Sequence, residues 1–445
     1  MKKKQDKSVH ASVLQIALTL ALISVSLVLI GSSFAQRSGV NAPVQSDSVY
    51  VLQGANAYAR EPDGSVPVIV TATGGNTAPT GYLTLQLAFA AINAGVHQGA
   101  ITVTIVGDTT EPISAVLNAS GALANYTSIS VQPSGGATRT ISGAIAAGNP
   151  LIDLNGATNV TIDGLGTAGN ALILSNITAS ATAGTSTIRF INGAQNNVVT
   201  RCTVLGSSTS TIGTAGGNIL FSTTSGLGNN GNIVSFCNLA PAGTNLPSKA
   251  VMSLGTAGNP NTGNLIDNDN IFDFFNATTS VSGIDIQGNN DNWTISNNRI
   301  FQTAPRTFTA AALRYAGITI NAGLGFGDAG AFSVTGNVIG FGAANATGTT
   351  TINGSTNEFR GLDLANVDTT TPTSVQGNII SGINQTSARN SVNHFESCFT
   401  AMALGTSDGR FNVGDITGNA IGSLDDSSTI VITATSTTAS TTLVS

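Results

Sequence analysis

Ionisable and aromatic residues gather in three long segments of the chain, at 301–317, 340–361 and 381–401. Aromatic faces beside arginine and glutamate side chains are what a groove for a sugar or a peptide requires. The candidate ligand-binding residues are Arg306, Arg314, Tyr315, Glu358, Arg360, Arg389, His394 and Glu396. The alternative interpretation is that the aromatic side chains pack these segments onto the rest of the protein and that the charges are solvated.

A second group, of acidic residues, comprises Asp267, Asp269, Asp273, Asp285 and Asp291, and Lys249 precedes it. Carboxylate oxygens are the ligands that calcium prefers, so Asp267 and Asp273 are the candidate metal ligands. The alternative is that these residues are solvated acids in turns. Because successive residues of a strand point to opposite faces, Asp267 and Asp273 need not converge with Asp269.

No residue is assigned a catalytic role. The sequence holds no cluster of histidine and cysteine that would bind zinc. Its only adjacent carboxylates, Asp425 and Asp426, lie near the C-terminus. The residues therefore favour a binding protein over an enzyme. No cofactor is expected, and calcium is the one metal that the acidic group could hold.

A six-residue pattern recurs eight times along the chain. It consists of an apolar residue, a small or polar residue, any residue, then Asn, Asp or Cys, any residue, and Ile, Leu or Val. The fourth positions lie 29 to 41 residues apart, and they are Asp163, Cys202, Cys237, Asp269, Asn298, Asn337, Asn378 and Asn419. Such side chains can bond to the backbone of their own turn and to the same residue one repeat away, so we expect an inward-facing ladder. The alternative is that they merely form turns.

A short alternating strand precedes each copy of the pattern. Its apolar pairs are Ile152/Leu154, Ile188/Phe190, Ile219/Phe221, Met252/Leu254, Ile284/Ile286, Ile318/Ile320, Leu362/Leu364 and Met402/Leu404. Alternation with a period of two places one face of a strand inside the protein. A repeat of about 35 residues holds three short strands, and a single unit cannot bury its inner face alone. The sequence therefore predicts an all-β, parallel β-helix of about eight or more rungs. A propeller needs four antiparallel strands per unit, and no hairpin signature is present.

The N-terminal residues predict a secretory signal peptide at 1–35. A basic start precedes a mostly apolar run at 13–30, and small residues stand at the cleavage position before residue 36. A retained membrane anchor is the alternative, since the run is about long enough to span a bilayer. A linker is expected to follow at 36–65.

Residues 82–95 are the best helix candidate, because their apolar side chains fall on one stripe and Gly95 provides a stop. An open solenoid end needs a cover, so this helix is assigned to an N-terminal cap with the first coils at 66–148. The β-helix is expected to occupy 149–425, with a Ser/Thr-rich strand or tail at 426–445.

The ladder and the strand columns resemble those of the right-handed parallel β-helix proteins of the pectin-lyase-like superfamily. The order of helix and coils also resembles secreted and surface β-helix proteins of Bacteroidetes-type bacteria. The resemblance spans roughly residues 66–425 and implies a right-handed solenoid with an N-terminal capping helix. Lyases with this scaffold use calcium-holding carboxylates with Arg or Lys as base, and hydrolases use paired or triple carboxylates. The hydrolase motifs Gly-His-Gly and Arg-x-Lys are missing here, so no catalytic residue is carried over.

Composition and charge exclude several functional classes. Residues 1–35 carry four lysines and one aspartate, so their removal leaves 12 basic and 21 acidic residues and a formal net charge of −9. An acidic, lysine-poor surface does not attract nucleic acid or anionic lipid. No second segment is long and apolar enough to span a membrane, so none is expected in the mature chain. Three cysteines are too few for a disulfide scaffold, and Cys202 and Cys237 are expected to be two adjacent buried thiols.

These observations lead to one hypothesis and one alternative. The hypothesis is a secreted or cell-surface bacterial interaction protein that binds an extracellular polysaccharide or a cell-surface glycan, or acts as an adhesin. The alternative is a polysaccharide lyase or glycoside hydrolase that acts on an acidic polysaccharide.

Overall fold

The computed structural model describes residues 51–53, 56–58, 66–135, 137–165, 170–322, 332–365, 367–368, 370–389, 397–405, 409–423 and 429–436. All of them belong to the second of two compact units, Ser48–Ser445. The predicted signal peptide and most of the predicted linker lie outside the described residues, as do His394, Glu396 and the pair Asp425-Asp426.

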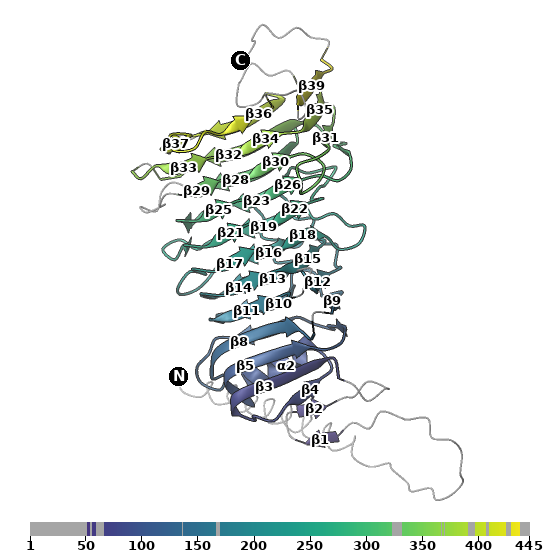
Figure 1. Ribbon diagram of the computed structural model, residues 1–445, viewed down its shortest axis with the longest axis vertical. Helices are drawn as coiled ribbons and strands as arrows, with labels where there is room; N and C mark the ends of the chain where they lie inside the picture. The colour runs from purple at the N-terminus through teal and green to yellow at the C-terminus, as the bar shows by residue number, and fades with distance from the viewer. Residues whose placement is uncertain are drawn as a thin grey trace, which may run out of the picture. The chain divides into compact units, whose positions relative to one another are not determined.

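Nearly all of the regular structure is β-strand, and most strands belong to three long sheets (Figure 1). Sheet I has nine strands: β7 (Ala115–Asn118), β10 (Pro150–Asn155), β13 (Ser186–Ile191), β16 (Gly217–Phe221), β19 (Lys249–Ser253), β23 (Val281–Ile286), β28 (Arg314–Asn321), β32 (Glu358–Ala365) and β36 (Phe399–Leu404). Sheet II has twelve: β4 (Thr80–Tyr82), β3 (Val68–Gly75), β5 (His97–Ile105), β8 (Tyr126–Pro133), β11 (Val160–Asp163), β14 (Val198–Thr200), β17 (Ile233–Ser235), β21 (Leu265–Asp267), β25 (Thr294–Ser296), β29 (Ser333–Thr335), β33 (Thr373–Gln376) and β37 (Phe411–Val413).

Sheet III has ten strands: β6 (Thr109–Thr110), β9 (Arg139–Gly143), β12 (Leu172–Asn176), β15 (Cys202–Gly206), β18 (Asn238–Pro241), β22 (Asn270–Phe272), β26 (Arg299–Phe301), β30 (Val338–Gly340), β34 (Ile379–Ser381) and β38 (Ala420–Ile421). A smaller sheet IV has four: β27 (Arg306–Thr307), β31 (Thr350–Asn353), β35 (Ile383–Ser387) and β39 (Ile430–Ala434). Two short pairs complete the strands: β1 (Val51–Gln53) with β2 (Asn56–Tyr58), and β20 (Asn261–Thr262) with β24 (Asn290–Asp291).

Each repeat of the chain contributes one strand to each long sheet, in the order sheet I, sheet II, sheet III. The strands β10, β11 and β12 pair in parallel with β13, β14 and β15 of the next repeat, and later repeats continue this pattern. Only the start of sheet II differs, because β3 pairs antiparallel with both β4 and β5. The all-β architecture of stacked parallel strands is confirmed, and it is consistent with a β-helix.

The interior is filled by apolar side chains that stack from one repeat to the next. The predicted inward pairs of sheet I lie in register between neighbouring repeats. In the fourth repeat the prediction is wrong by one residue, because Val251 rather than Met252 continues the inner column, and Ser253 takes the place of Leu254. Val251 and Met252 are both apolar and fully buried, so alternation alone could not separate them.

A ladder of asparagine side chains runs through the turn between sheets II and III. The amide of Asn298 donates to Asn337 Oδ1 at 2.9 Å, and that of Asn337 donates to Asn378 Oδ1 at 3.0 Å. Asn378 in turn donates to Asn419 Oδ1 at 2.9 Å. Each amide also donates to a carbonyl on the sheet II strand of the preceding repeat, as Asn337 does to Ile295 O at 2.9 Å. The ladder thereby pairs polar groups that would otherwise be buried without partners.

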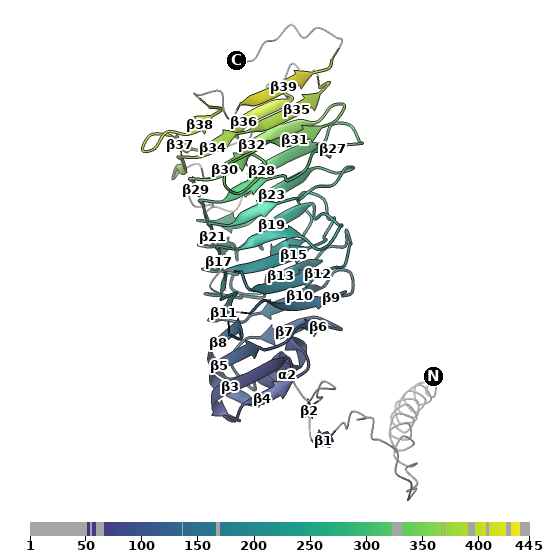
Figure 2. The same cartoon turned by 45° about the vertical axis from the view of Figure 1, so that its right-hand side comes forward.

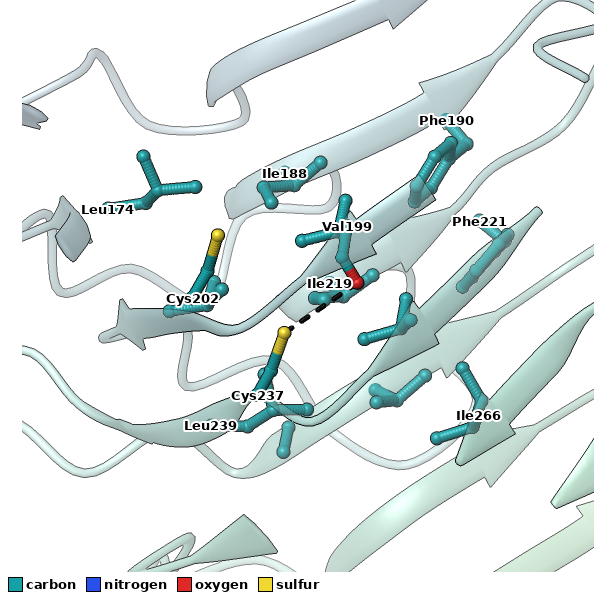
Figure 3. Close-up of a cluster of buried hydrophobic side chains, with 14 of the residues drawn as sticks. Leu174, Ile188, Phe190, Val199, Cys202, Ile219, Phe221, Cys237, Leu239 and Ile266 are labelled. Atoms are coloured by element: carbon teal, nitrogen blue, oxygen red, sulfur yellow. Dashed lines mark hydrogen bonds between the residues drawn. The ribbon is translucent and has the colours of Figure 1, made fainter. Parts of the chain in front are cut away.

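Cys202 and Cys237 hold the ladder position in two earlier repeats, and both are fully buried among aliphatic side chains (Figure 3). Their thiols lie 3.7 Å from the carbonyls of Ile162 and Val199 respectively. These carbonyls correspond to those that accept from the asparagine amides in later repeats. Each thiol lies nearer still to a second carbonyl, that of Thr200 at 3.2 Å for Cys202 and that of Ser235 at 3.3 Å for Cys237. A weak S–H donor between two carbonyls therefore takes the place of the asparagine amide. The three cysteines are free thiols.

Asp163 is not part of the ladder, which corrects the sequence prediction. It ends β11, and its carboxylate forms an ion pair with Arg201 on the outer side. The residue that aligns with Cys202 in this repeat is Leu172. Additional residues between β11 and β12 separate the six-residue pattern from the true ladder position, so the pattern matched too early in the turn.

A second asparagine ladder, which the six-residue pattern does not include, stands just before the strands of sheet II. The amide of Asn197 donates to Asn232 Oδ1 at 2.9 Å, and that of Asn232 donates to Asn264 Oδ1 at 3.1 Å. All three residues are buried. Each lies five residues before the first ladder's position in its repeat, and this constant spacing was the available signal. In the next repeat the buried Trp293 takes the place of asparagine.

The predicted helix is present as α2 (Leu85–Asn93), and its buried face carries the apolar stripe. Thr84 accepts from the backbone of Leu87 as N-cap, and the carboxylate of Glu111 accepts from Leu85 N and Gln86 N at 2.9 and 2.8 Å. At its other end, Asn93 exchanges hydrogen bonds with the backbone of β7. Since β7 is the edge strand of sheet I, the helix lies against that edge.

Candidate functional site

The three inserted segments of the sequence lie side by side as strands of sheet IV (Figure 2). β27 pairs with β31 and β31 with β35, all in parallel. The fourth strand, β39, comes from the Ser/Thr-rich C-terminal segment and pairs with β35. Insertions at the same turn of successive repeats thus extend the stack sideways instead of forming separate loops.

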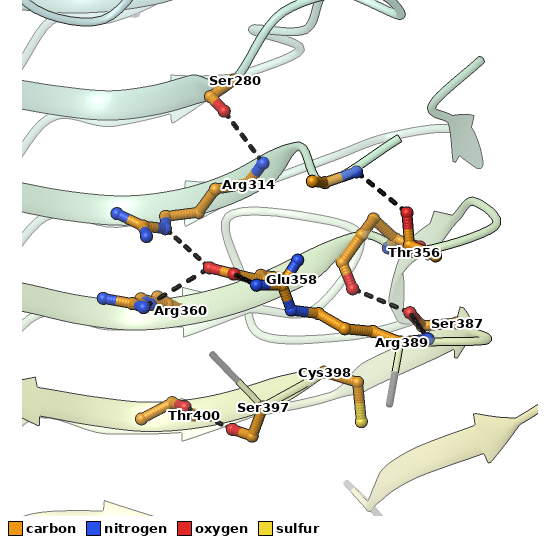
Figure 4. A network of polar contacts seen from close by, with 12 residues as sticks. Ser280, Arg314, Thr356, Glu358, Arg360, Ser387, Arg389, Ser397, Cys398 and Thr400 are labelled. Atoms are coloured by element: carbon orange, nitrogen blue, oxygen red, sulfur yellow. Dashed lines mark hydrogen bonds and ion pairs between the residues drawn. The ribbon is translucent and has the colours of Figure 1, made fainter. Parts of the chain in front are cut away.

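Three arginines and two carboxylates converge beside this sheet, on β28, β32 and the residues after β35 (Figure 4). We call Arg314, Glu358, Arg360, Asp363 and Arg389 the arginine cluster. Glu358 forms ion pairs with Arg314 Nε at 2.9 Å, with Arg360 at 3.4 Å and with Arg389 at 2.6 Å. Asp363 forms ion pairs with Arg314 at 2.7 Å and with Arg360 at 2.8 Å. Each carboxylate therefore orients more than one guanidinium group.

Strand register and one glycine bring these side chains together. Arg314 on β28 stands directly opposite Glu358 on β32. Phe359 and Leu362 are both in the core, so the alternation of β32 shifts at Gly361. A Cβ at Gly361 would lie 2.6 Å from a backbone oxygen of the next strand and 2.7 Å from a core isoleucine. Arg360 and Asp363, three residues apart, consequently share the outer side and pair with each other.

The arginine cluster is partly open to solvent. Glu358, Arg360 and Asp363 are buried, whereas the side chain of Arg314 is 37% exposed. The described members comprise three guanidinium groups and two carboxylates, so their formal charge is one positive unit. In a chain with a net charge of −6, the cluster is a local excess of positive charge.

Arg306, another of the candidate ligand-binding residues, is not a member of the arginine cluster and has other partners. Its guanidinium pairs with Asp273 at 2.5 Å and donates to Gln302 at 2.8 Å. Asp273 also accepts from the backbone and hydroxyl of Thr303. Arg306 and Asp273 thus tie β27 to the turn after β22.

Tyr315 is a core residue and not part of a ligand surface, contrary to the sequence hypothesis. Its side chain is fully buried and stacks between Phe274 and Phe359, with 5.2 Å between ring centroids on each side. The stack continues to Phe399. Burial raises the pKa of Tyr315. Phe308 and Phe359 are buried as well, so for these aromatic residues the alternative interpretation of packing is confirmed. Its other half is wrong, because the charged Glu358 and Arg360 are buried and not solvated.

The two predicted calcium ligands do not share a site. Asp267 lies on sheet II and accepts from Ser296 Oγ at 2.6 Å and Asn297 Nδ2 at 3.0 Å. Asp273 follows a strand of sheet III and is engaged by Arg306. In the described ranges, no group of three His, Cys, Asp or Glu side chains is arranged to hold a metal ion.

Lys249 anchors a loop and is engaged by backbone oxygens. Its ammonium donates to the carbonyls of Ser210 at 3.1 Å, Thr214 at 2.8 Å, and Thr211. Burial lowers the pKa of Lys249 to about 8, and the nearby Asp285 partly offsets this effect. The loop between β15 and β16 is thereby fixed over the outer side of sheet I. The position of Lys249 in the sequence, before the acidic group, does not predict this role.

No protein-family model matches the chain, and no curated protein matches its sequence. Over the residues that the structure describes, no helix combines the length and the apolar character needed to cross a membrane.

Proposed function

We propose that this protein is a secreted or cell-surface interaction protein that binds an acidic polysaccharide. We further propose that its fold is a right-handed parallel β-helix of the pectin-lyase-like kind, capped by α2. The strand order, which is the same in each repeat, supports the β-helix. Parallel crossover connections are strongly preferred in the right-handed form, and this preference supports a right-handed β-helix. The contact of α2 with the edge strand β7 supports the capping role.

The arginine cluster is the observation that carries the binding proposal. Glu358 and Asp363 already hold the guanidinium groups in place, so these side chains would lose little conformational entropy when a ligand binds. A guanidinium forms paired hydrogen bonds with a carboxylate or a sulfate. Arg314 is the exposed member, and we assign to it the contact with a uronate or sulfate group.

A polymer suits this site better than a small anion. One partly exposed arginine gives a weak contact, because water screens its charge. A polysaccharide repeats its acidic group many times, and repeated chances of rebinding raise its apparent affinity. We assign no catalytic role to the arginine cluster, because each of its arginines is held in an ion pair with Glu358 or Asp363.

The test compares polygalacturonate with its methyl ester, which has the same backbone without the charge. Arg314→Gln should weaken binding of polygalacturonate about tenfold. Arg299→Gln is the matched control, since Arg299 is a partly exposed arginine on sheet III outside the arginine cluster. The control should bind like the unchanged protein. Release of unsaturated or reducing ends is measured in the same samples.

Two outcomes would contradict the proposal. Equal binding of the two polymers would show that charge is not recognised, and equal effects of the two substitutions would remove the arginine cluster from the site. Cleavage of the polymer would instead support the lyase or hydrolase alternative.

A further inference from the structure

The turn between sheets II and III has the same backbone conformation in six successive repeats. One residue of each turn has a positive φ, between 52° and 66°. These residues are Arg201, Phe236, Asn268, Asn297, Gly336 and Gly377. The residues before them are paired in register, from Thr200 to Gln376. Each of the six also donates its backbone N–H to a carbonyl of the next repeat, at 2.9–3.1 Å, so the six positions are structurally equivalent.

Two of these residues, Arg201 and Phe236, do not suit this conformation. A left-handed backbone brings Cβ close to the following carbonyl oxygen, which is unfavourable for most residues. Glycine has no Cβ, and the short polar side chain of asparagine tolerates the conformation. The later repeats use only asparagine and glycine at this position. The turn itself therefore requires neither Arg201 nor Phe236.

Burial does not account for these two side chains either. Phe236 is 55% exposed, and the side chain of Arg201 is 47% exposed. A single exposed apolar side chain is common on a protein surface, but this one also stands at a strained backbone position. Residues held in strained conformations cluster at functional sites, so the turn is a candidate for a binding role.

We call Arg201, Phe236, Asn268 and Asn297 the turn row. All four residues are exposed. Neighbouring members are about 4.8 Å apart, because they hold the same position in adjacent repeats of a parallel stack. The turn row therefore presents a guanidinium group, an aromatic ring and two amides in line along the stack.

Hydrogen bonds hold the first half of the turn row in place. Arg201 Nε donates to Asp163 at 2.9 Å, and Arg201 Nη2 forms an ion pair with the same carboxylate. In the orientation that its neighbours require, the amide of Asn170 donates to the carbonyls of Arg201 and Phe236 at 3.3 and 3.0 Å. A ligand would therefore meet side chains and backbone that are already ordered.

The second half of the turn row is polar and is not positively charged. Asn268 and Asn297 donate to the carboxylate of Asp267 at 2.6 and 3.0 Å. An amide has two N–H groups and one carbonyl oxygen, so each retains groups that can bond to hydroxyls. With Arg201 and Asp163, the region holds one guanidinium group and two carboxylates, a formal charge of one negative unit. Such a surface repels an acidic polymer and suits a neutral ligand rich in hydroxyl groups.

We propose that the turn row is a second binding site, for a neutral polysaccharide built of pyranose units. The exposed ring of Phe236 stacks on the apolar face of one unit, and the polar members bond to hydroxyls of the units on either side. A polymer fits better than a single sugar, because the turn row spans four repeats and their spacing is close to the length of one unit. This site lies at a different turn from the arginine cluster and does not depend on acidic ligands binding there.

The test is affinity electrophoresis in native gels that contain hydroxyethyl cellulose, xyloglucan or galactomannan, three soluble neutral polysaccharides. At least one of them should retard the unchanged protein. Phe236→Asn should weaken this binding about tenfold, because it removes the exposed ring. The same substitution should raise the melting temperature by about 1–2 °C, because asparagine suits the left-handed backbone. Phe236→Trp should retain binding, since it keeps an aromatic face.

Leu227→Asn is the matched control, since Leu227 is an exposed apolar residue in another turn of the same repeat, and this variant should bind like the unchanged protein. Arg314→Gln should not alter binding of the neutral polymers, and Phe236→Asn should not alter binding of polygalacturonate, so the two sites are tested separately. The proposal is overturned if none of the three polymers retards the protein, or if Leu227→Asn and Phe236→Asn weaken binding equally. A lower melting temperature for Phe236→Asn would also overturn it, because Phe236 would then have a structural role.

Discussion

Replacement of Asn337 by alanine tests whether the asparagine ladder stabilises the stack. Asn337 donates to Ile295 O at 2.9 Å and to Asn378 Oδ1 at 3.0 Å. It accepts from the backbone N of Asn298 at 3.1 Å and from its amide at 2.9 Å. Alanine removes the side chain that forms hydrogen bonds with these four groups in the interior. A buried polar group without a partner costs about 1–3 kcal/mol. Because the neighbouring asparagines keep their other bonds, we expect a loss of about 3–5 kcal/mol in the free energy of unfolding.

Denaturation by guanidinium chloride, followed by tryptophan fluorescence, measures this loss. Trp293 is the only tryptophan and is fully buried, so its emission reports on the interior of the stack. Asn345→Ala is the matched control, since the side chain of Asn345 is exposed and bonds only to the hydroxyl of Thr347. The control should lose about 0.5 kcal/mol or less.

A loss for Asn337→Ala close to that of the control would refute the reasoning. It would mean that neighbouring groups pair with each other or with water when the amide is gone. The slope of free energy against denaturant should stay unchanged, because the same surface is exposed on unfolding.

Much of the fold could be predicted from the sequence, since every repeat of a parallel stack requires the same residue types at the same positions. An inward position needs an apolar residue and the ladder turn needs a small polar one, so both recur at regular intervals in the sequence. The prediction was wrong where two neighbouring residues both had the required character. Val251 and Met252 are both apolar, and Asp163 fits the turn pattern although Leu172 holds the aligned position.

The candidate site was less predictable, because the outer positions of successive repeats need not share a residue type. The sequence brought Arg314, Glu358, Arg360 and Arg389 into one hypothesis, but it did not include Asp363. The outward position of Asp363 depends on the shift of alternation at Gly361, which the period of two does not encode. The prediction for Tyr315 was wrong for a different reason. An aromatic residue in an inserted segment can pack inward or face a ligand, and the observed ring stacking shows that Tyr315 packs inward.

Three further predictions follow from buried groups. Tyr315→Ala should cost about 3–5 kcal/mol of unfolding free energy, whereas Tyr315→Phe should cost little, because the hydroxyl makes one hydrogen bond, of 3.4 Å; thermal unfolding of both variants checks this. Titration of the unfolded, unreduced protein should find three free thiols, and a single one would mean that Cys202 and Cys237 are bridged. Asp269→Asn should stabilise the protein at neutral pH. Burial raises the pKa of Asp269 well above its ordinary value of 3.8, and its Oδ2 has no hydrogen-bond partner among the described residues. The folded state thus binds the proton more tightly than the unfolded state, so the wild type loses stability as the pH rises above about 4 towards the folded-state pKa. An amide cannot ionise, and by the ladder's geometry it would donate to Asn298 Oδ1 and to the carbonyl of Val234. The gain of Asp269→Asn over the wild type should therefore grow between pH 4 and pH 7, to about 1–3 kcal/mol, in denaturant titrations at a series of pH values. A gain that is absent at pH 7, or equal at every pH, would show that the carboxyl is not protonated in the folded protein.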